Sequence, residues 1–245
     1  MEREILPGRA GGAERVGRRV RRPAGPWTPA VHEFLVFLRE QGLRGIPQVH
    51  GVETTWELLS YVPGRGVPTD EVVLGDVLVE AVAWLRDFHD IAEAFRPAGP
   101  RRWRHTESEL EPGQIICHND PGTYNWIIEG GHFAAMIDWD MAGPGQRIDD
   151  LAFLAWTALP LDRAADDDEL LRRLDLLVDA YGEYGPLTVL NAVAARMDTA
   201  CDRIAAGQER GDPAMINLAR SGEPERTRDL VKAFLERKTR WESSL

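Results

Sequence analysis

The sequence predicts an α+β protein with two lobes, a reduced β-rich N-terminal lobe and a mainly helical C-terminal lobe. Short strand-like runs separated by turn residues dominate the first part of the chain, whereas residues 167–241 show helical periodicity in three pieces. Between these parts, the Pro- and Gly-rich stretch "VPGRGVP" at 62–68 is typical of a linker. We therefore expect an N-terminal lobe over residues 1–62 and a C-terminal lobe over residues 63–245.

The composition is that of a folded protein and argues against a nucleic-acid-binding surface. The chain has 245 residues, of which 43% are hydrophobic and eight are Trp, so a sizeable core can form and overall disorder is excluded. The formal net charge of -11 does not favour nucleic acid as a partner. Cys117 and Cys201 form neither a metal-spaced pair nor a disulfide framework. No secretory leader or bilayer-spanning apolar run is visible, so we expect a cytoplasmic protein without a membrane partner.

The N-terminal lobe is expected to contain a hairpin, a helix and two further strands. Residues 9–22 (RAGGAERVGRRVRR) are Arg-rich around short Val-containing pieces, and "AGG" predicts the turn of the hairpin. Thr28 is expected to cap the helix that follows, with Pro29 at its first position. The apolar stripe of this helix consists of Val31, Phe34, Leu35 and Leu38. The runs at 46–52 and 56–64 then predict two strands joined by the turn "ETT".

The C-terminal lobe is expected to begin with a helix and to continue with strands around a polar loop. Helical periodicity predicts the first helix over residues 72–89. An Arg- and Pro-rich loop at 96–104 precedes the apolar strands "QIICHND" and "WIIEGGHFAAMIDWD", the second of which turns at its Gly-Gly pair. Asp149 or Asp150 is expected to cap the helix "LAFLAWTAL".

The polar loop "CHNDPGTYN" carries the residue types that phosphoryl transfer needs. That reaction requires a carboxylate beside the attacking hydroxyl, oxygen ligands for Mg²⁺ and a cation near the donor phosphates. Asn125 precedes one strand and Asp138 ends the next, so a hairpin would bring them together, with Asp120 facing a substrate hydroxyl. Mg²⁺ prefers such oxygen ligands. The simpler alternative is a polar loop in which Asp120 is a turn residue and Asp138 is a cap.

The segment "CHNDPGTYNWII…AAMIDWDMAGPGQRIDDLAFLAW" resembles the catalytic segment of the aminoglycoside phosphotransferase family, which has the protein-kinase-like fold. The upstream "VRRPAGPWTPAVHEFLVFLREQG…GIPQVHGV…WELLSYVPG" resembles a short bacterial branch of that family with trifolitoxin-immunity-like members. The resemblance covers about residues 10 to 160, and the later helices match only in general character.

The resemblance implies roles for individual residues of the polar loop. Asp120 would be the catalytic base or the residue that orients the acceptor hydroxyl. Asn125 and Asp138 would bind Mg²⁺ and, through it, the nucleotide phosphates. His118 would brace the loop by hydrogen bonds, which is also the commoner role of a buried His. Asp140 would be an extra carboxylate near the metal without being a ligand.

The resemblance also implies a nucleotide site with ATP or GTP as phosphate donor. Ser60, Tyr61 and Val62 resemble the hinge whose backbone groups would hydrogen-bond the base. The turn "PGRAGG" would contact phosphate through backbone N–H groups, although its glycine spacing departs from the usual pattern of a glycine loop.

The family usually carries a phosphate-binding Lys that is held by a Glu, whereas no Lys precedes Lys232 in this chain. The matching stretch is "RRVRRP", so Arg21 is the expected cation and Arg22 is the alternative. Glu33 is expected to pair with this cation because it lies in the helix that follows. The alternative is that these Arg residues form a solvated basic face.

These inferences together predict a Mg²⁺-dependent O-phosphotransferase that acts on the hydroxyl of a small molecule such as an aminoglycoside, another antibiotic or an amino alcohol. The acidic stretch "DDDE" at 166–169 either attracts a cationic acceptor or forms an ordinary solvated helix end. The absent Lys and the short first lobe support an alternative function, that of an immunity or binding protein that sequesters a toxic peptide or small molecule without turnover. A hydrolase with a metal alone is disfavoured because no His-rich cluster accompanies the carboxylates.

Overall fold

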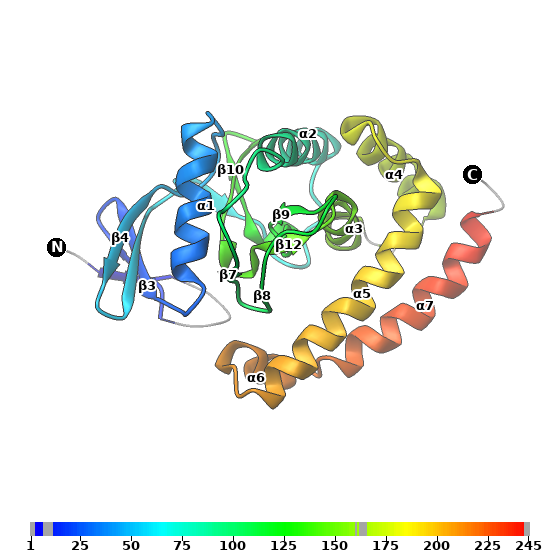
Figure 1. Ribbon diagram of the computed structural model, residues 1–245. Coiled ribbons are helices and arrows are strands. Elements are labelled where there is room, and N and C mark those ends of the chain that lie inside the picture. Colours follow the sequence, from blue (N-terminus) through cyan, green and yellow to red (C-terminus); the bar gives the residue numbers. More distant parts are fainter. Residues whose placement is uncertain (1–2, 7–11, 160, 162–165, 243–245) are drawn as a thin grey trace.

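The computed structural model describes residues 3–6, 12–159, 161 and 166–242. An antiparallel sheet with one helix forms the N-terminal part, and a mainly helical part follows, with short strands at its centre (Figure 1). The predicted α+β class is confirmed. Within the described residues no helix is both long and apolar enough to cross a membrane.

Five antiparallel strands form the N-terminal sheet, in the order β1-β2-β3-β5-β4. Their bounds are β1 (Arg3–Ile5), β2 (Glu14–Val16), β3 (Arg19–Pro23), β4 (Val49–Glu53) and β5 (Trp56–Ser60). The expected hairpin is confirmed between β2 and β3, but it turns at Gly17, whose φ of +62° favours glycine. The predicted turn "AGG" lies instead between β1 and β2, largely within residues 7–11, which are outside the described residues.

Helix α1 (Thr28–Glu40) packs its predicted apolar stripe into the core, and all four residues of that stripe are buried. Thr28 is not the cap, because Trp27 occupies that position and the Thr28 hydroxyl accepts a hydrogen bond from the Gly25 N–H at 2.9 Å. The Phe34 ring lies 6.1 Å from the Trp139 ring, centroid to centroid, so α1 shares its core with the second part of the chain.

The stretch expected to be a linker contains a strand that joins the two parts. Strand β6 (Arg65–Gly66) pairs with β10 (Trp126–Glu129), which in turn forms a hairpin with β11 (His132–Met136). Gly64 precedes this strand with a φ of +131°, and an added Cβ would lie 2.4 Å from Ile127 Cγ2. The linker expectation is therefore wrong for residues 65–66, and the boundary at Val62 stays a prediction.

Helices α2 and α3 enclose the central strands (Figure 1). Their bounds are α2 (Gly75–Ala92), β7 (Arg101–Arg102), β8 (Glu107–Ser108), β9 (Ile115–Cys117), β12 (Gly143–Gly145) and α3 (Arg147–Ala158). Residue Gln146 precedes α3 and forms a reciprocal capping box with Asp149, so Asp149 is the Asp that supports the helix start.

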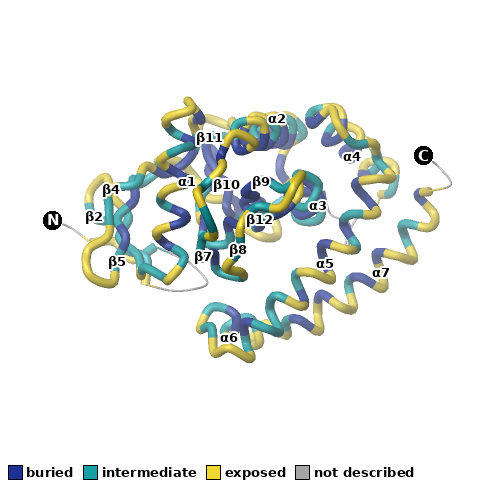
Figure 2. Tube along the Cα trace, in the orientation of Figure 1, coloured by how far each residue is buried: buried dark blue, intermediate teal, exposed yellow. Residues whose placement is uncertain are grey.

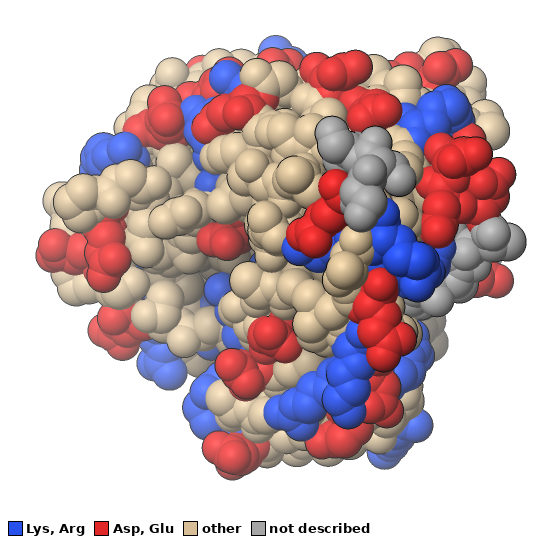
Figure 3. Space-filling model, turned by 90° about the vertical axis from the view of Figure 1, so that its right-hand side faces the viewer, with Lys and Arg blue, Asp and Glu red and all other residues tan. Residues whose placement is uncertain are grey.

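Four helices complete the described chain, where three were expected. They are α4 (Asp167–Tyr181), α5 (Pro186–Glu209), α6 (Pro213–Ala219) and α7 (Glu225–Trp241). The additional break falls at Gly222, whose φ is +83°. Helices α5 and α7 lie side by side, with buried residues on their facing sides (Figure 2). The face formed by these helices mixes acidic and basic residues without a patch of one sign (Figure 3).

Candidate active site

Asp150, at the start of α3, fixes the polar loop in place. Its buried carboxylate accepts hydrogen bonds from the backbone N–H groups of His118 and Asn119, each at 2.7 Å, and lies 3.2 Å from His89 Nε2. Burial raises the pKa of Asp150, but His89 and the loop amides outweigh it, so the pKa is lowered and the group stays ionised. Sequence reasoning considered Asp150 only as a helix cap and missed this role.

His118 is buried and braces the loop as a neutral ring. Its Nδ1 accepts from the Asp120 N–H at 3.3 Å, so Nε2 carries the proton and donates to the Ile137 carbonyl at 3.2 Å. Burial lowers the pKa of His118, which keeps the ring neutral. The bracing hydrogen bonds expected of this residue are confirmed.

Asp120 and Asn125 lie in direct contact, which the sequence analysis did not predict. The Asn125 amide nitrogen donates to the Asp120 carbonyl at 2.9 Å and to its carboxylate at 3.2 Å. The Tyr124 hydroxyl donates to the other carboxylate oxygen. Because the amide nitrogen of Asn125 is used in this way, its amide oxygen is directed elsewhere and has no partner among the described residues.

Asp138 lies at the end of β11 with a half-exposed side chain, 50% accessible, and a φ of +63°. The Ile137 N–H donates to the Asn125 carbonyl at 2.9 Å, so Asp138 directly follows the residue that pairs with Asn125. The hairpin thus brings these two residues to neighbouring strand ends, as predicted. A non-glycine residue at positive φ is strained, and such residues cluster at functional sites.

Arg22 of β3 occupies the centre of the charged groups around Asp138. Its guanidinium donates to Asp138 at 2.7 Å, to Asp140 at 2.6 Å and, through Nε, to Glu57 at 2.6 Å. The other Glu57 oxygen lies 2.6 Å from Nε2 of His32 on α1. Burial would lower the pKa of Arg22, but the three carboxylates outweigh it and raise the pKa.

Asp138 and Asp140, which both contact Arg22, have net pKa shifts of opposite direction. Burial raises the pKa of Asp140, and the neighbouring Asp138 and Glu57 charges add to this effect. For Asp138 burial also raises the pKa, yet the facing Arg22 guanidinium outweighs it and the net pKa is lowered. Asp138 is therefore the carboxylate that stays ionised most readily.

The expected pair of Arg21 and Glu33 is not formed, and this expectation was wrong. Successive residues of a strand face opposite sides, so Arg21 points away from Asp138 and stacks 4.1 Å from the Trp56 ring centroid. Glu33 instead pairs with Arg101 at 2.7 Å. Arg22, the alternative cation, faces the carboxylates, and its partner is Glu57. Sequence reasoning missed Glu57, although a Glu within the apolar strand "WELLS" was a usable indication.

The predicted hinge is largely engaged within the N-terminal sheet. The Ser60 N–H donates to the Gln48 carbonyl at 2.8 Å, and the Tyr61 N–H donates to the Arg18 carbonyl at 2.9 Å. Among the described residues, Val62 forms no backbone hydrogen bond. Of the N–H groups of the three predicted hinge residues, that of Val62 is therefore the one without a backbone partner within the described residues.

The acidic stretch at 166–169 has structural partners, as an ordinary helix end would. Asp166 caps α4 through the Asp168 N–H at 2.9 Å, Asp167 pairs with Arg237, and Glu169 pairs with Arg172. These contacts lie on α4 and α7 rather than at the polar loop.

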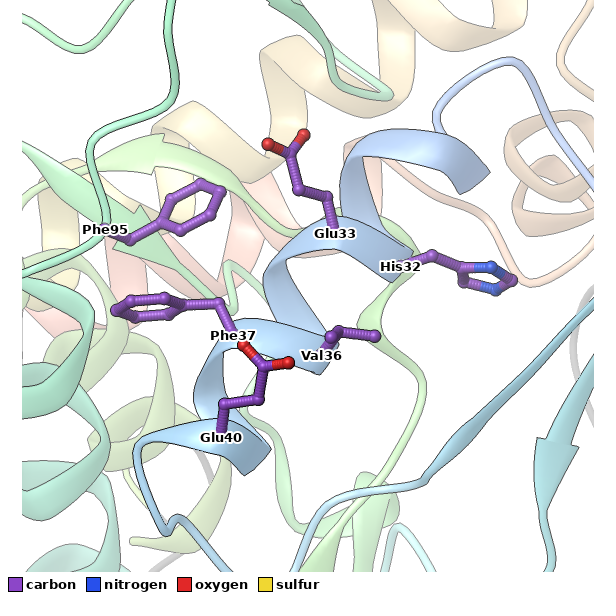
Figure 4. A pocket seen from close by; sticks show the side chains of 6 residues that line it. All are labelled: His32, Glu33, Val36, Phe37, Glu40 and Phe95. Carbon is purple, nitrogen blue, oxygen red and sulfur yellow. The ribbon is translucent and has the colours of Figure 1, made fainter.

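A surface hollow of about 420 Å³ lies on the outer side of α1 rather than at the polar loop (Figure 4). Val36 and Phe37 form its floor with Phe95, and Glu33 and Glu40 lie at its edge. None of the residues that surround Asp120 lines it.

The geometry agrees with comparisons to known proteins. A family model described as "Phosphotransferase enzyme family" matches residues 103–187. The Trifolitoxin immunity protein of Rhizobium leguminosarum bv. trifolii is 31% identical over 195 residues, which are 70% of this chain and 72% of that protein. The chain belongs to the phosphotransferase enzyme family.

Comparison with solved structures shows the fold of the chain. Choline kinase from Cryptosporidium parvum matches with a TM-score of 0.64 at 10% identity, over 99% of this chain and 90% of that one. The GDP and kanamycin complex of APH(2")-IIia matches with a TM-score of 0.63 at 13% identity, over 96% and 93% of the two chains. At such identities the likeness concerns the fold, which is kinase-like, as expected from the sequence.

Proposed function

We propose that the chain is a Mg²⁺-dependent O-phosphotransferase that transfers the γ-phosphate of ATP or GTP to a hydroxyl of a small molecule. The observation that carries the proposal is the convergence of Asp120, Asn125 and Asp138 at one end of the β10–β11 hairpin. Membership of the phosphotransferase enzyme family supports the reaction class.

The residues at the hairpin end fit a magnesium ion. The amide oxygen of the buried Asn125 and the half-exposed Asp138 carboxylate are hard oxygen donors, the ligand type that Mg²⁺ prefers. They would hold Mg²⁺, which when bound neutralises charge on the donor phosphates. The remaining coordination positions would be filled by phosphate oxygens and water, as Mg²⁺ prefers.

Asp120 would orient the acceptor hydroxyl and accept its proton. Hydrogen bonds from Tyr124 and Asn125 fix the direction of this carboxylate, and such positioning lowers the barrier without requiring a strong base. Arg22 would supply the cation beside the donor phosphates. Since Arg22 contacts Asp138 in this structure, nucleotide binding would replace that contact with one to phosphate.

A calorimetric titration with Mg²⁺-ATP and Mg²⁺-GTP tests this proposal. We expect saturable heat from at least one nucleotide, and its loss in Asp138→Asn. Glu33→Gln is the matched control, because its carboxylate pairs with Arg101 away from the site. A folded wild-type protein that binds neither nucleotide, or an Asp138→Asn variant that binds as well as the wild type, would contradict the proposal.

The second candidate function is that of an immunity protein that sequesters a toxic peptide or small molecule. The contact of Arg22 with three carboxylates and the 31% identity to a protein named for trifolitoxin immunity support it. Turnover separates the two candidates. Release of ADP that depends on an added hydroxyl compound favours the enzyme, whereas nucleotide-independent binding of a toxin favours sequestration.

A further inference from the structure

Helix α5 directs a row of arginines towards the polar loop. Arg196, Arg203 and Arg210 are spaced by seven residues, so they lie along one face of the helix. Arg196 donates to the Asn119 carbonyl at 2.6 Å, and Arg203 donates to the Asn119 side-chain oxygen at 3.1 Å. Asn119 immediately precedes Asp120. The two arginines therefore lie beside the residue proposed to orient the acceptor.

The Arg196 guanidinium is buried with unused hydrogen-bond donors. Its residue exposure is 4%, and its Nε and Nη1 atoms are buried without a hydrogen-bond partner. One face of the group lies over the Phe153 ring, 4.6 Å from the centroid. A buried cation without hydrogen-bond partners destabilises the folded protein, because nothing offsets the free energy of removing it from water. An anionic ligand that contacts such a cation is therefore bound more strongly than one that contacts an exposed arginine.

Neither Arg196 nor Arg203 forms an ion pair with any carboxylate of the described part of the chain. Asp150, Asp120 and Asp149 act on Arg196 through space, but none of them lies within ion-pair distance, and Asp150 and Asp149 already hold the loop amides and the capping box of α3. Among the described residues, the two guanidinium groups are therefore cations without a direct anionic partner.

Several positive charges, including that of Arg203, also surround His105. Burial, reinforced by the charges of Arg203, Arg104 and Arg210, lowers the pKa of His105 to about 3, while Asp212 acts in the opposite direction. Burial and the neighbouring Arg196 lower the pKa of Arg203 to about 10, which leaves it charged near neutral pH. Arg104, in the β7–β8 turn, is itself paired with Asp212 at 2.8 Å and with Asp140 at 3.3 Å, whereas Arg203 forms no ion pair within the described part of the chain.

We propose that the acceptor carries an anionic group, a carboxylate or a phosphate, that Arg196 and Arg203 bind while its hydroxyl faces Asp120. This inference rests on the proposed phosphotransferase function and specifies its substrate class. The guanidinium fork matches both anions, because each offers paired oxygens to parallel N–H donors. Arg203 is partly exposed and is the first of the two that a solute would meet.

Phosphorylation of such an acceptor would be an ordinary phosphoryl transfer. The hydroxyl oxygen forms a bond to the γ-phosphorus while the bond from that phosphorus to the β,γ-bridging oxygen breaks, and the nucleoside diphosphate leaves with the electron pair. The Asp120 carboxylate takes the hydroxyl proton and returns it to solvent. The anionic group of the acceptor takes no part in bond making, and its contacts with α5 position the hydroxyl.

Binding of simple anions tests this site separately from turnover. The probes are sodium acetate and inorganic phosphate at constant ionic strength, with Mg²⁺-AMP-PNP present to fill the nucleotide site. We expect at least one probe to raise the Tm of the wild-type protein by about 2–4 °C once it exceeds its Kd about fivefold. This rise should be absent in Arg203→Gln and partly retained in Arg203→Lys. Which probe responds identifies a carboxylate or a phosphate as the preferred group.

The control variant is Arg172→Gln, which removes an exposed arginine paired with Glu169 on α4 and should keep the full response. No response of the wild-type protein to either anion, or an equal response in Arg203→Gln, overturns the proposal. A response to anions without any heat from either Mg²⁺-ATP or Mg²⁺-GTP would instead contradict the phosphotransferase function and leave the anion site standing.

Matched acceptors extend the test to turnover. L-Serine and ethanolamine differ by a carboxylate, and glycerol 3-phosphate and glycerol differ by a phosphate. Where an anionic member is phosphorylated, Arg203→Gln should raise its KM by about tenfold to hundredfold, because it removes a charged hydrogen bond, with a smaller effect on kcat. An arginine that only supports Asn119 would change kcat for both members of a pair alike.

Discussion

The Arg22 guanidinium donates a 2.7 Å hydrogen bond to Asp138 and so connects the N-terminal sheet to the end of β11. The same guanidinium contacts Glu57, whose side chain is only 2% exposed. One arginine therefore compensates a buried carboxylate of the sheet and a half-exposed carboxylate of the candidate active site. We therefore expect this residue to affect the stability of the chain and, under the proposed function, its affinity for nucleotide.

Arg22→Met should lower the free energy of unfolding by up to about 3–5 kcal/mol, because the buried Glu57 would keep only the His32 ring as a partner. Urea denaturation at neutral pH measures the change. Arg21→Met is the matched control on the same strand. It removes a contact with the Trp56 ring and a 3.8 Å ion pair with Glu14, and it should cost about 1 kcal/mol or less. Equal losses of unfolding free energy in the two variants would show that Arg22 contributes no more to stability than Arg21 does.

Asp120→Asn should keep the fold and the nucleotide affinity while kcat falls by about 10²- to 10⁴-fold, because the acceptor proton loses its carboxylate. Tyr124→Phe, which removes only a hydrogen bond to that carboxylate, should have a smaller effect on kcat. Steady-state ADP release measures both variants. Near-normal turnover in Asp120→Asn would remove this residue from the mechanism.

His105 should make stability depend on pH below neutrality. Its pKa of about 3 lies below the ordinary value of 6.5, so the unfolded chain binds a proton that the folded chain rejects. The contribution of His105 is fully present above pH 6.5 and is lost as pH falls from 6.5 towards 3. His105→Gln should therefore reduce the slope of the unfolding free energy by about 1.4 kcal/mol per pH unit between these limits.

His132 offers a control of opposite sign for the pH experiment. Its hydrogen bond and ion pair with Glu80 raise its pKa, so its contribution is present below pH 6.5 and is lost as pH rises through the raised value. His132→Gln should leave the slope between about pH 5 and pH 6.5 unchanged, and it should alter the slope only at lower pH, where Glu80, whose pKa the His132 contact lowers, titrates. If His105→Gln left the dependence of the unfolding free energy on pH unchanged between pH 3 and 6.5, the pKa of His105 would not be lowered in the folded protein.

Gly64→Ala should destabilise the connection between the two parts of the chain. The added Cβ would lie 2.7 Å from the Ile128 carbonyl oxygen, and the φ of +131° is strained for alanine. We expect a loss of about 1–3 kcal/mol in the free energy of unfolding, with a lower Tm. Gly66→Ala is the control within β6, since its Cβ would meet nothing within 4 Å, and it should change stability by about 0.5 kcal/mol or less.

Much of the fold followed from local patterns in the sequence. The apolar stripe of α1, the Gly-Gly turn between β10 and β11, and the polar loop around Asp120 were predicted because each depends on spacing within a few residues. The convergence of Asn125 and Asp138 also followed, since a tight hairpin determines which strand ends meet.

The sequence analysis missed features that depend on contacts between segments far apart in the chain. Choosing between Arg21 and Arg22 requires knowing which face of β3 meets β11, and only the register of the sheet decides this. Strand β6 is two residues long in a Gly-rich stretch, so no local pattern distinguishes it from a linker. Arg196 resembles a solvated helix residue in the sequence, and its burial becomes evident only when α5 packs across the loop.

The contacts of α5 with Asn119 lie outside the segment that the family model matches. That match ends at residue 187, in the first turn of α5, whereas Arg196 and Arg203 lie later in the same helix. If these arginines recognise the acceptor, as proposed, a change of either side chain would alter which molecules bind while Asp120, Asn125 and Asp138 stay the same.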